Sequence, residues 1–143
     1  MAGGSQDPFN LDRFKAQSVN YQEALAELRA GRKRTHWSWY VLPQMRGLGS
    51  SDMAVRYAIS GADEARAYLS HPVLGARLRE CMSAINAHEG SSAVEILGSV
   101  DAQKFHSCAT LFASVSGEDS PFHTALNKYF SGVPDRNTIA MLS

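Results

Sequence analysis

Apolar residues recur every three or four positions along much of the chain, a spacing that places them on one face of an α-helix. The clearest run begins at Leu11 and stops before Gly31, a residue type that commonly caps the C-terminal end of a helix. The positions on its inward stripe are Leu11, Phe14, Ser18, Tyr21, Leu25 and Leu28. This pattern predicts one continuous amphipathic helix between these limits.

Several shorter helical patterns follow, and most of them carry a start or stop signal. Ser50 or Ser51 supplies an N-cap. Ser92 and Glu95 have the spacing of a capping box, and Pro121 occupies a first helical position. The predicted helices span residues 51–59, 63–69, 72–85, 92–98, 101–115 and 121–132, with a short one after 135. No run alternates between apolar and polar residues as a strand does, so we expect an all-α fold of about seven helices, several short, with essentially no β-sheet.

A chain of 143 residues fits one compact domain, which we place at residues 7–143. Residues 1–6 are small and polar, and we interpret them as a disordered tail or a cloning remnant. Cys81 and Cys108 are too few for a disulfide framework and favour the reducing cytoplasm. The chain has no apolar run long enough to cross a bilayer and no secretory signal, so we expect no membrane association.

The net charge is zero, but the basic residues are unevenly distributed. Residues 29–56 contain six basic side chains and one acidic side chain, Asp52. Within this stretch, residues 31–51 also contain both tryptophans, a histidine and several glycines, and show no sustained helical or strand period. We therefore predict a structured loop with one helical turn, of the kind that often carries a binding site.

The candidate site residues come from this loop and from one position further along the chain. Basic side chains bind phosphate, aromatic rings stack on planar ligands, and glycines before a helix start allow an anion to approach the backbone closely. The candidate ligand-binding residues are Arg32, Lys33, Arg34, Trp37, Trp39, Gln44, Gly47, Gly49, Ser50 and Lys104. His36 is the candidate general acid or base, because an unperturbed histidine titrates near neutral pH. Asp101 and Asp135 could join the site through the fold, although capping and surface charge are the simpler roles for them.

Other chemistries have little support in the sequence. The remaining histidines and the cysteines lack metal-ligand spacing, so we expect no metal site and no cofactor. No serine or cysteine lies in a nucleophile motif. The loop also has a purely structural interpretation, because tryptophans are more often core anchors than ligand platforms.

Several segments of the chain are distinctive: Asp7-Pro8-Phe9, GRKRTHWSWYVLPQMRGLGSS, AVRYAI, EARAYLSHPVLGARLREC, the stretch around Asp101 and Lys104 that ends in TLF, and residues 130–142. In these segments the chain resembles the uncharacterised bacterial domain-of-unknown-function family eighteen-ten, which is sometimes mislabelled calpastatin-like. This resemblance implies an all-helical single domain and carries no activity. The calpastatin label does not fit, because that kind of inhibitor is a disordered chain and this sequence is patterned to fold.

Three functions remain open at this point. The first is binding of a phosphate-bearing small ligand, such as a nucleotide or a nucleotide-derived metabolite, at residues 31–51, with possible acid–base chemistry at His36. The second is nucleic-acid binding through the same basic and aromatic residues, which the zero net charge disfavours. The third is a structural or interaction domain in which this loop is core. The sequence leaves open whether the protein is an enzyme and what its oligomeric state is.

Overall fold

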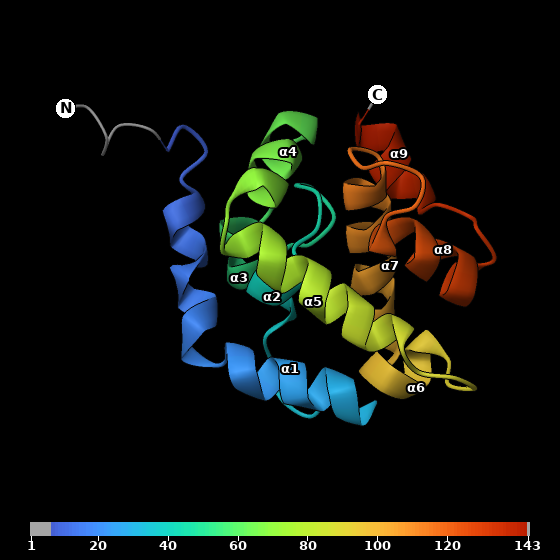
Figure 1. Cartoon of the computed structure of the whole chain (residues 1–143). Helices are drawn as coiled ribbons and strands as arrows, with labels where there is room; N and C mark the ends of the chain where they lie inside the picture. The colour runs from blue at the N-terminus through green and yellow to red at the C-terminus, as the bar shows by residue number, and fades with distance from the viewer. Residues whose placement is uncertain (1–6, 143) are drawn as a thin grey trace.

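The computed structural model describes residues 7–142, which form helices joined by short loops (Figure 1). In chain order these are the 3-10 helix η2 (Leu11–Val19) and the α-helices α1 (Tyr21–Ala30), α2 (Ser38–Val41), α3 (Asp52–Arg56), α4 (Ala62–Ser70), α5 (Leu74–Asn86), α6 (Ala93–Leu97), α7 (Ser99–Ala113), α8 (Pro121–Phe130) and α9 (Arg136–Leu142). Across these residues the only β-type pairing is an isolated bridge between Met45 and Ile59. The predicted all-α fold is confirmed, and the expectation for residues 1–6 lies outside the described part of the chain.

The helix ends follow the capping signals of the sequence. Gly31 ends α1 in the left-handed region with φ of 78°. Ser92 and Glu95 form a complete capping box at α6. The hydroxyl of Ser120 caps α8, whose first residue is Pro121. Local sequence therefore determines where these helices begin and end.

The prediction of one continuous helix from Leu11 to Gly31 is wrong. The chain forms the 3-10 helix η2, breaks at Asn20, where φ is −135°, and resumes as α1. The buried residues of η2 are Leu11, Phe14 and Gln17, which are three positions apart and so share one face of a helix with three residues per turn. Gln17, and not the predicted Ser18, faces inward, where its Nε2 donates to the Tyr40 carbonyl at 2.6 Å.

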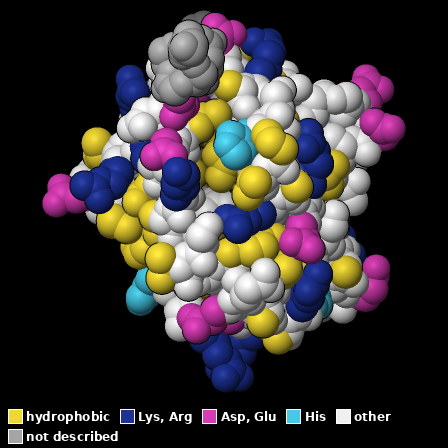
Figure 2. Space-filling model, turned by 60° about the vertical axis from the view of Figure 1, so that its left-hand side comes forward, with side chains coloured by type: hydrophobic (Ala, Val, Ile, Leu, Met, Phe, Trp, Pro, Cys, Tyr) yellow, Lys and Arg dark blue, Asp and Glu magenta, His cyan; other side chains and the backbone are white. Residues whose placement is uncertain are grey.

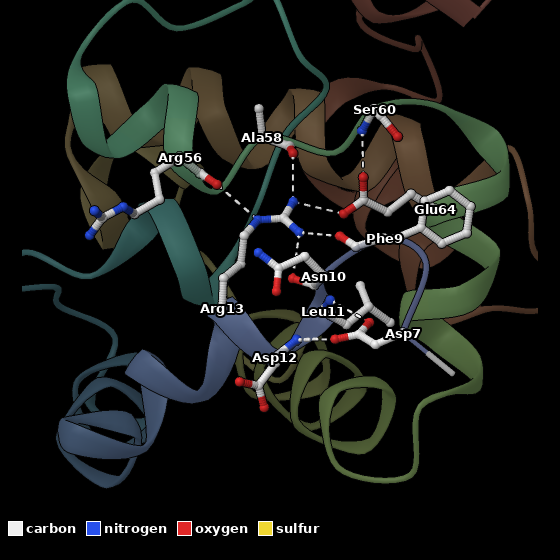
Figure 3. A network of polar contacts seen from close by, with 10 residues as sticks. All are labelled: Asp7, Phe9, Asn10, Leu11, Asp12, Arg13, Arg56, Ala58, Ser60 and Glu64. Atoms are coloured by element: carbon white, nitrogen blue, oxygen red, sulfur yellow. Dashed lines mark hydrogen bonds and ion pairs between the residues drawn. The ribbon is translucent and has the colours of Figure 1, made fainter. Parts of the chain in front are cut away.

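Arg13 joins η2 to the segment between α3 and α4 (Figure 3). Its Nε donates to the Arg56 carbonyl at 2.8 Å, and Nη2 donates to the Ala58 carbonyl at 2.8 Å and to Glu64 Oε2 at 2.7 Å. Nη1 donates to the carbonyls of Phe9 and Asn10 at 2.7 and 2.9 Å. All five N–H donors of the guanidinium therefore have partners within the protein.

Two long helices organise the core. Figure 1 shows α5 running diagonally across the molecule, with η2 and α1 on one side and α7 and α8 on the other. The helix α5 packs against α1, α4 and α8, and α7 packs against α4, α6, α8 and α9. The largest fully buried side chains include Trp37, Tyr68, Phe14, Phe105, Phe112 and Phe122. Among residues 7–142, no helix has the length and apolar character needed to cross a membrane.

Candidate functional site

The loop after α1 is built around the carboxylate of Glu27. Its Oε1 accepts hydrogen bonds from the backbone N–H groups of Arg34 and Thr35, at 2.8 and 3.1 Å, and from Trp37 Nε1 at 3.0 Å. Its Oε2 accepts from the Thr35 hydroxyl at 2.6 Å. Burial favours the protonated form, but these hydrogen bonds together outweigh it and lower the pKa of Glu27 to about 2. The anion bound by this part of the basic loop is therefore a side chain of the protein itself.

Lys33 is also occupied within the fold. Its Nζ lies 2.8 Å from Asp101 Oδ2 and donates to the Thr35 carbonyl at 2.5 Å, and the side chain is only 6% exposed. Arg32 and Arg34, in contrast, are exposed, and within residues 7–142 neither forms an ion pair. The three consecutive basic residues therefore do not converge on one point.

The aromatic residues of the loop are divided between core and surface. Trp37 is completely buried, and its only polar atom donates to Glu27. Trp39 is half-buried, with Lys104 Nζ 6.0 Å from its ring centroid. His36 is exposed, and its ring centroid lies 6.4 Å from that of Trp39. The interpretation of this loop as part of the core therefore fits Trp37 and does not fit Trp39 or His36.

A groove of about 400 Å³ lies between the loop after α2 and the first half of α7. Its lining residues are Gln44, Leu48 and Gly49 from the loop, Val100, Gln103, Lys104 and Ser107 from α7, and Asp135 and Asn137 from the start of α9. Counted from Val100, the other three α7 residues lie three, four and seven positions further along, so all four share one face of that helix. Three of the candidate ligand-binding residues, Gln44, Gly49 and Lys104, meet in this groove, although Lys104 is far from the other two in the chain.

Lys104 brings positive charge to the groove. Its Nζ is 3.7 Å from Asp101 Oδ1, while the other oxygen of Asp101 lies 2.8 Å from Lys33. One carboxylate thus serves two ammonium groups, which leaves one positive charge in this cluster without a matching acid. The side-chain amides of Gln44 and Asn137 also line the groove, and neither has a hydrogen-bond partner within the described chain.

Asp135, by contrast, is fully used in holding α9 against α7. Its Oδ1 accepts from Gln103 Nε2 at 3.0 Å, and its Oδ2 accepts from the Ser107 hydroxyl at 3.2 Å and from the backbone N–H and hydroxyl of Thr138 at 3.0 and 2.7 Å. Burial favours protonation, but the hydrogen bonds from Thr138 and Ser107 outweigh it and hold the pKa of Asp135 below 3.8. This carboxylate therefore has a structural role in the groove wall.

The glycines near the groove are required for space and for backbone conformation. A Cβ on Gly49 would lie 2.6 Å from Ala54 Cβ and 3.1 Å from Gln44 Nε2, so glycine lets the Gln44 amide lie against the loop. Gly47 adopts φ of 96° and lies outside the groove lining, against Met141. Ser51, and not Ser50, caps α3, by accepting from the Ala54 N–H at 3.1 Å. Neither serine lines the groove.

In two other hollows, the charged side chains already have partners within the protein. In the hollow of about 490 Å³ between α4 and α8, Arg66 pairs with Asp63 at 3.0 Å and Arg79 donates to the Leu69 carbonyl at 3.2 Å.

The second hollow, of about 290 Å³, lies between η2 and the start of α5. Figure 2 shows the η2 side of the molecule, where apolar side chains gather among basic ones. Arg77 in this hollow donates to Ser18 at 3.0 Å, and His71 Nδ1 accepts from the N–H groups of Val73 and Leu74. The groove at Lys104 differs from both hollows in that several of its polar groups are free.

Sequence reasoning missed four residues that shape this region. Gln103 and Ser107 share the helical face of Lys104, so the spacing in the predicted 101–115 helix could have revealed them. Nothing in the local sequence indicates the position of Asn137 or the burial of Ser38, because both depend on contacts between segments that are distant in the chain.

The fold and the groove together define a small all-α domain in which a groove of about 400 Å³ lies beside a lysine that shares its acidic partner. Residues 8–142 match the family described as "Protein of unknown function (DUF1810)", and the chain belongs to this family. It is also similar to the crystal structure of the conserved hypothetical protein Rv1873 from Mycobacterium tuberculosis, with 51% sequence identity and a TM-score of 0.92. That alignment covers 95% of this chain and 98% of the other. Among curated proteins, none matches the chain.

Proposed function

We propose that this protein binds a small phosphate-bearing ligand, of the nucleotide class, in the groove between the 44–49 loop and α7. The observation that carries the proposal is Lys104, a residue of the groove lining whose one acidic partner within residues 7–142, Asp101, is shared with Lys33. An unmatched cation beside free amide groups favours an anion with several acceptor oxygens, which describes a phosphate.

The size and the lining of the groove support a ligand larger than phosphate alone. A volume of about 400 Å³ lies within the range of small-molecule sites. The side chains of Leu48 and Val100 provide apolar surface on opposite walls, where a planar ring can lie. Gln44 and Asn137 can then bind the polar edge of such a ring or the sugar that joins it to the phosphate.

This assignment moves the site relative to the sequence-based hypothesis. The ligand contacts Gln44, Gly49 and Lys104, while Lys33 and Trp37 support the loop from the interior. The proposal is one of binding, and it gives His36 no chemical role because that side chain does not line the groove. Burial of Trp37 also removes one of the two stacking platforms that nucleic-acid binding would use.

The test is a thermal-shift screen of the purified protein with nucleotides, dinucleotides, ADP-ribose and sugar phosphates, followed by calorimetry on any compound that responds. A ligand at about 100 times its Kd stabilises the folded state by about 2.7 kcal/mol and raises Tm by several degrees. Lys104→Met should weaken binding about tenfold or more, because it removes a charge-assisted hydrogen bond. Its free energy of unfolding should change by only about 0.5 kcal/mol, because the lost ion pair is long and partly exposed.

Lys15→Met is the matched control. Lys15 is exposed on η2 and pairs with Asp12, far from the groove lining, so this variant should bind as the wild type does. A flat screen, or equal binding by the wild type and Lys104→Met, would contradict the proposal. Tight binding of oligonucleotides with a steep salt dependence would instead indicate a nucleic-acid-binding module.

A further inference from the structure

A small chamber adjoins the groove, and Gln44 and Lys104 line both spaces. The other residues around the chamber are Ser38, Trp39, Leu42, Ala54 and Tyr57. Its volume is about 10 Å³, which is room for one water molecule or one oxygen of a larger group. The chamber is thus too small for a ring or a whole phosphate.

The hydroxyl of Ser38 is a buried polar group without a partner. Ser38 is 3% exposed, and within the described residues its Oγ has no hydrogen bond. The buried hydroxyls of α7 bond to carbonyls of their own helix: Ser107 donates to Gln103 and Thr110 donates to His106. Ser38 is the first residue of the short helix α2, so it has no preceding helical turn to accept its proton.

One other buried side-chain N or O atom in residues 7–142 lacks a hydrogen-bond partner, but it belongs to a side chain that is held by another hydrogen bond. It is Asn86 Oδ1, whose amide is already fixed because Nδ2 donates to the Pro121 carbonyl at 2.9 Å. Ser38 has no such anchor. An unsatisfied buried hydroxyl is unfavourable in the free protein, so its position beside a small chamber points to a group that enters from outside.

The chemistry around the chamber favours an anionic oxygen. Lys104 can only donate, and the Gln44 amide and the Ser38 hydroxyl can both donate. Ser38, Gln44 and Lys104, which come from three segments of the chain, thus bring donor groups to the lining of a space the size of one oxygen atom. Leu42, Ala54 and Tyr57 close the rest of the chamber, so an oxygen that carried a further substituent would not fit.

We propose that this chamber is the inner subsite of the groove, where Ser38, Gln44 and Lys104 hold one non-bridging oxygen of the ligand's phosphate. This inference rests on the proposed function, because it assumes that the groove binds a phosphate. It makes Ser38 a specificity-determining residue, since a ligand without an oxygen in this place leaves three donors unpaired.

The experiment is a titration of wild-type protein, Ser38→Ala and Ser38→Val with inorganic phosphate and with AMP, followed by amide chemical shifts and calorimetry. We expect both probes to shift the resonances of Ser38, Gln44 and Lys104 in the wild type. Ser38→Ala should bind about tenfold more weakly, and Ser38→Val should bind more weakly still, because its methyl groups occupy the chamber. The Tm of free Ser38→Ala should be unchanged or raised, because the hydroxyl has no partner to lose.

Ser114→Ala is the matched control, because the Ser114 hydroxyl is bonded within its own helix and lies away from the groove. It should bind both probes as the wild type does. Equal affinity of Ser38→Ala or Ser38→Val and the wild type would overturn the subsite while leaving the groove as a phosphate site. A large fall in the Tm of Ser38→Ala would show a structural partner for the hydroxyl and would also overturn it. If neither probe binds the wild type, and no compound in the wider screen binds, the proposed function fails and the subsite fails with it.

Discussion

At the scale of single residues, the basic loop is explained by acids that lie elsewhere in the chain. Glu27 binds the backbone of residues 34 and 35, and Asp101 binds Lys33. A basic run beside unpaired backbone N–H groups predicts that an anion binds there. For the first half of this run, that anion is a carboxylate of the protein itself. Lys104, which shares Asp101 with Lys33, belongs to a different helix.

Replacing Glu27 with Gln should destabilise the protein by about 2 to 3 kcal/mol. The amide keeps one acceptor oxygen but loses the negative charge that strengthens the hydrogen bonds from Arg34, Thr35 and Trp37. Urea unfolding at neutral pH measures this change. Glu23→Gln is the control: Glu23 is exposed, and its Oε1 lies 3.0 Å from the Thr35 hydroxyl, which is closer to Glu27, so its replacement should cost about 0.5 kcal/mol or less.

The same carboxylate makes stability depend on pH. Its pKa is about 2 in the folded protein against 4.5 for a free side chain, so its stabilisation is complete above pH 4.5 and is lost as the pH falls toward 2. A shift of this size corresponds to about 3 kcal/mol. In Glu27→Gln the decline of stability over this range should be shallower than in the wild type. Parallel pH profiles would show that Glu27 is not the group responsible.

At the scale of elements, η2 is held to the molecule by a narrow apolar face and by hydrogen bonds of Arg13 and Gln17. The sequence suggests a longer α-helix because Leu11 and Phe14 continue the spacing of α1. Tertiary contacts decide otherwise, since Arg13 and Gln17 both reach partners that lie across the fold.

Arg13→Lys should lower the free energy of unfolding by about 3 kcal/mol. A lysine keeps the positive charge but has three donors in place of the five-donor fork. It therefore cannot pair with Glu64, whose side chain is 3% exposed, and also donate to all the carbonyls that Arg13 binds. Chemical denaturation gives the value. Arg66→Lys is the matched substitution, because Arg66 pairs with Asp63 at an exposed position, and it should change stability by about 0.5 kcal/mol or less. Similar losses in the two variants would contradict the role assigned to Arg13.

At the scale of the whole molecule, α5 and α7 bury both cysteines in the common core. Cys81 and Cys108 are each completely buried and free. Burial raises the pKa of Cys81 to about 12 and raises the pKa of Cys108 further still. Neither thiol is therefore reactive in the folded protein.

Modification by a thiol reagent such as DTNB should accordingly report global unfolding. In native buffer both cysteines should react only through opening of the core, so the rate should rise with urea in step with the unfolded population. Both should react at once in concentrated denaturant. Rapid reaction of either thiol in native buffer would show that α5 or α7 opens locally.

Much of the fold is predictable because helix formation depends on short-range pattern and capping. Helices begin or end where the sequence predicts it at three places: at Gly31, at Ser92 with Glu95, and at Pro121. The exception, η2, arises where long-range hydrogen bonds change the type of helix without changing which residues are apolar.

The candidate site is only partly predictable, because a groove consists of residues that are neighbours in space and distant in sequence. The residue types of Gln44, Gly49 and Lys104 indicate a binding role, but only the packing shows that they line the same groove. Ser38 and Asn137 carry no local signal at all.

The sequence by itself determines the all-α class, most helix boundaries and the family, because these depend on periodicity and on motifs within short segments. Only the tertiary structure decides which charges remain free. Three such outcomes depend on which side chains meet across the fold. Lys33 pairs with Asp101, Glu27 binds the backbone of residues 34 and 35, and the Ser38 hydroxyl is left without a partner. The physical reason is that whether a charge or a hydroxyl has a partner is a property of its three-dimensional surroundings.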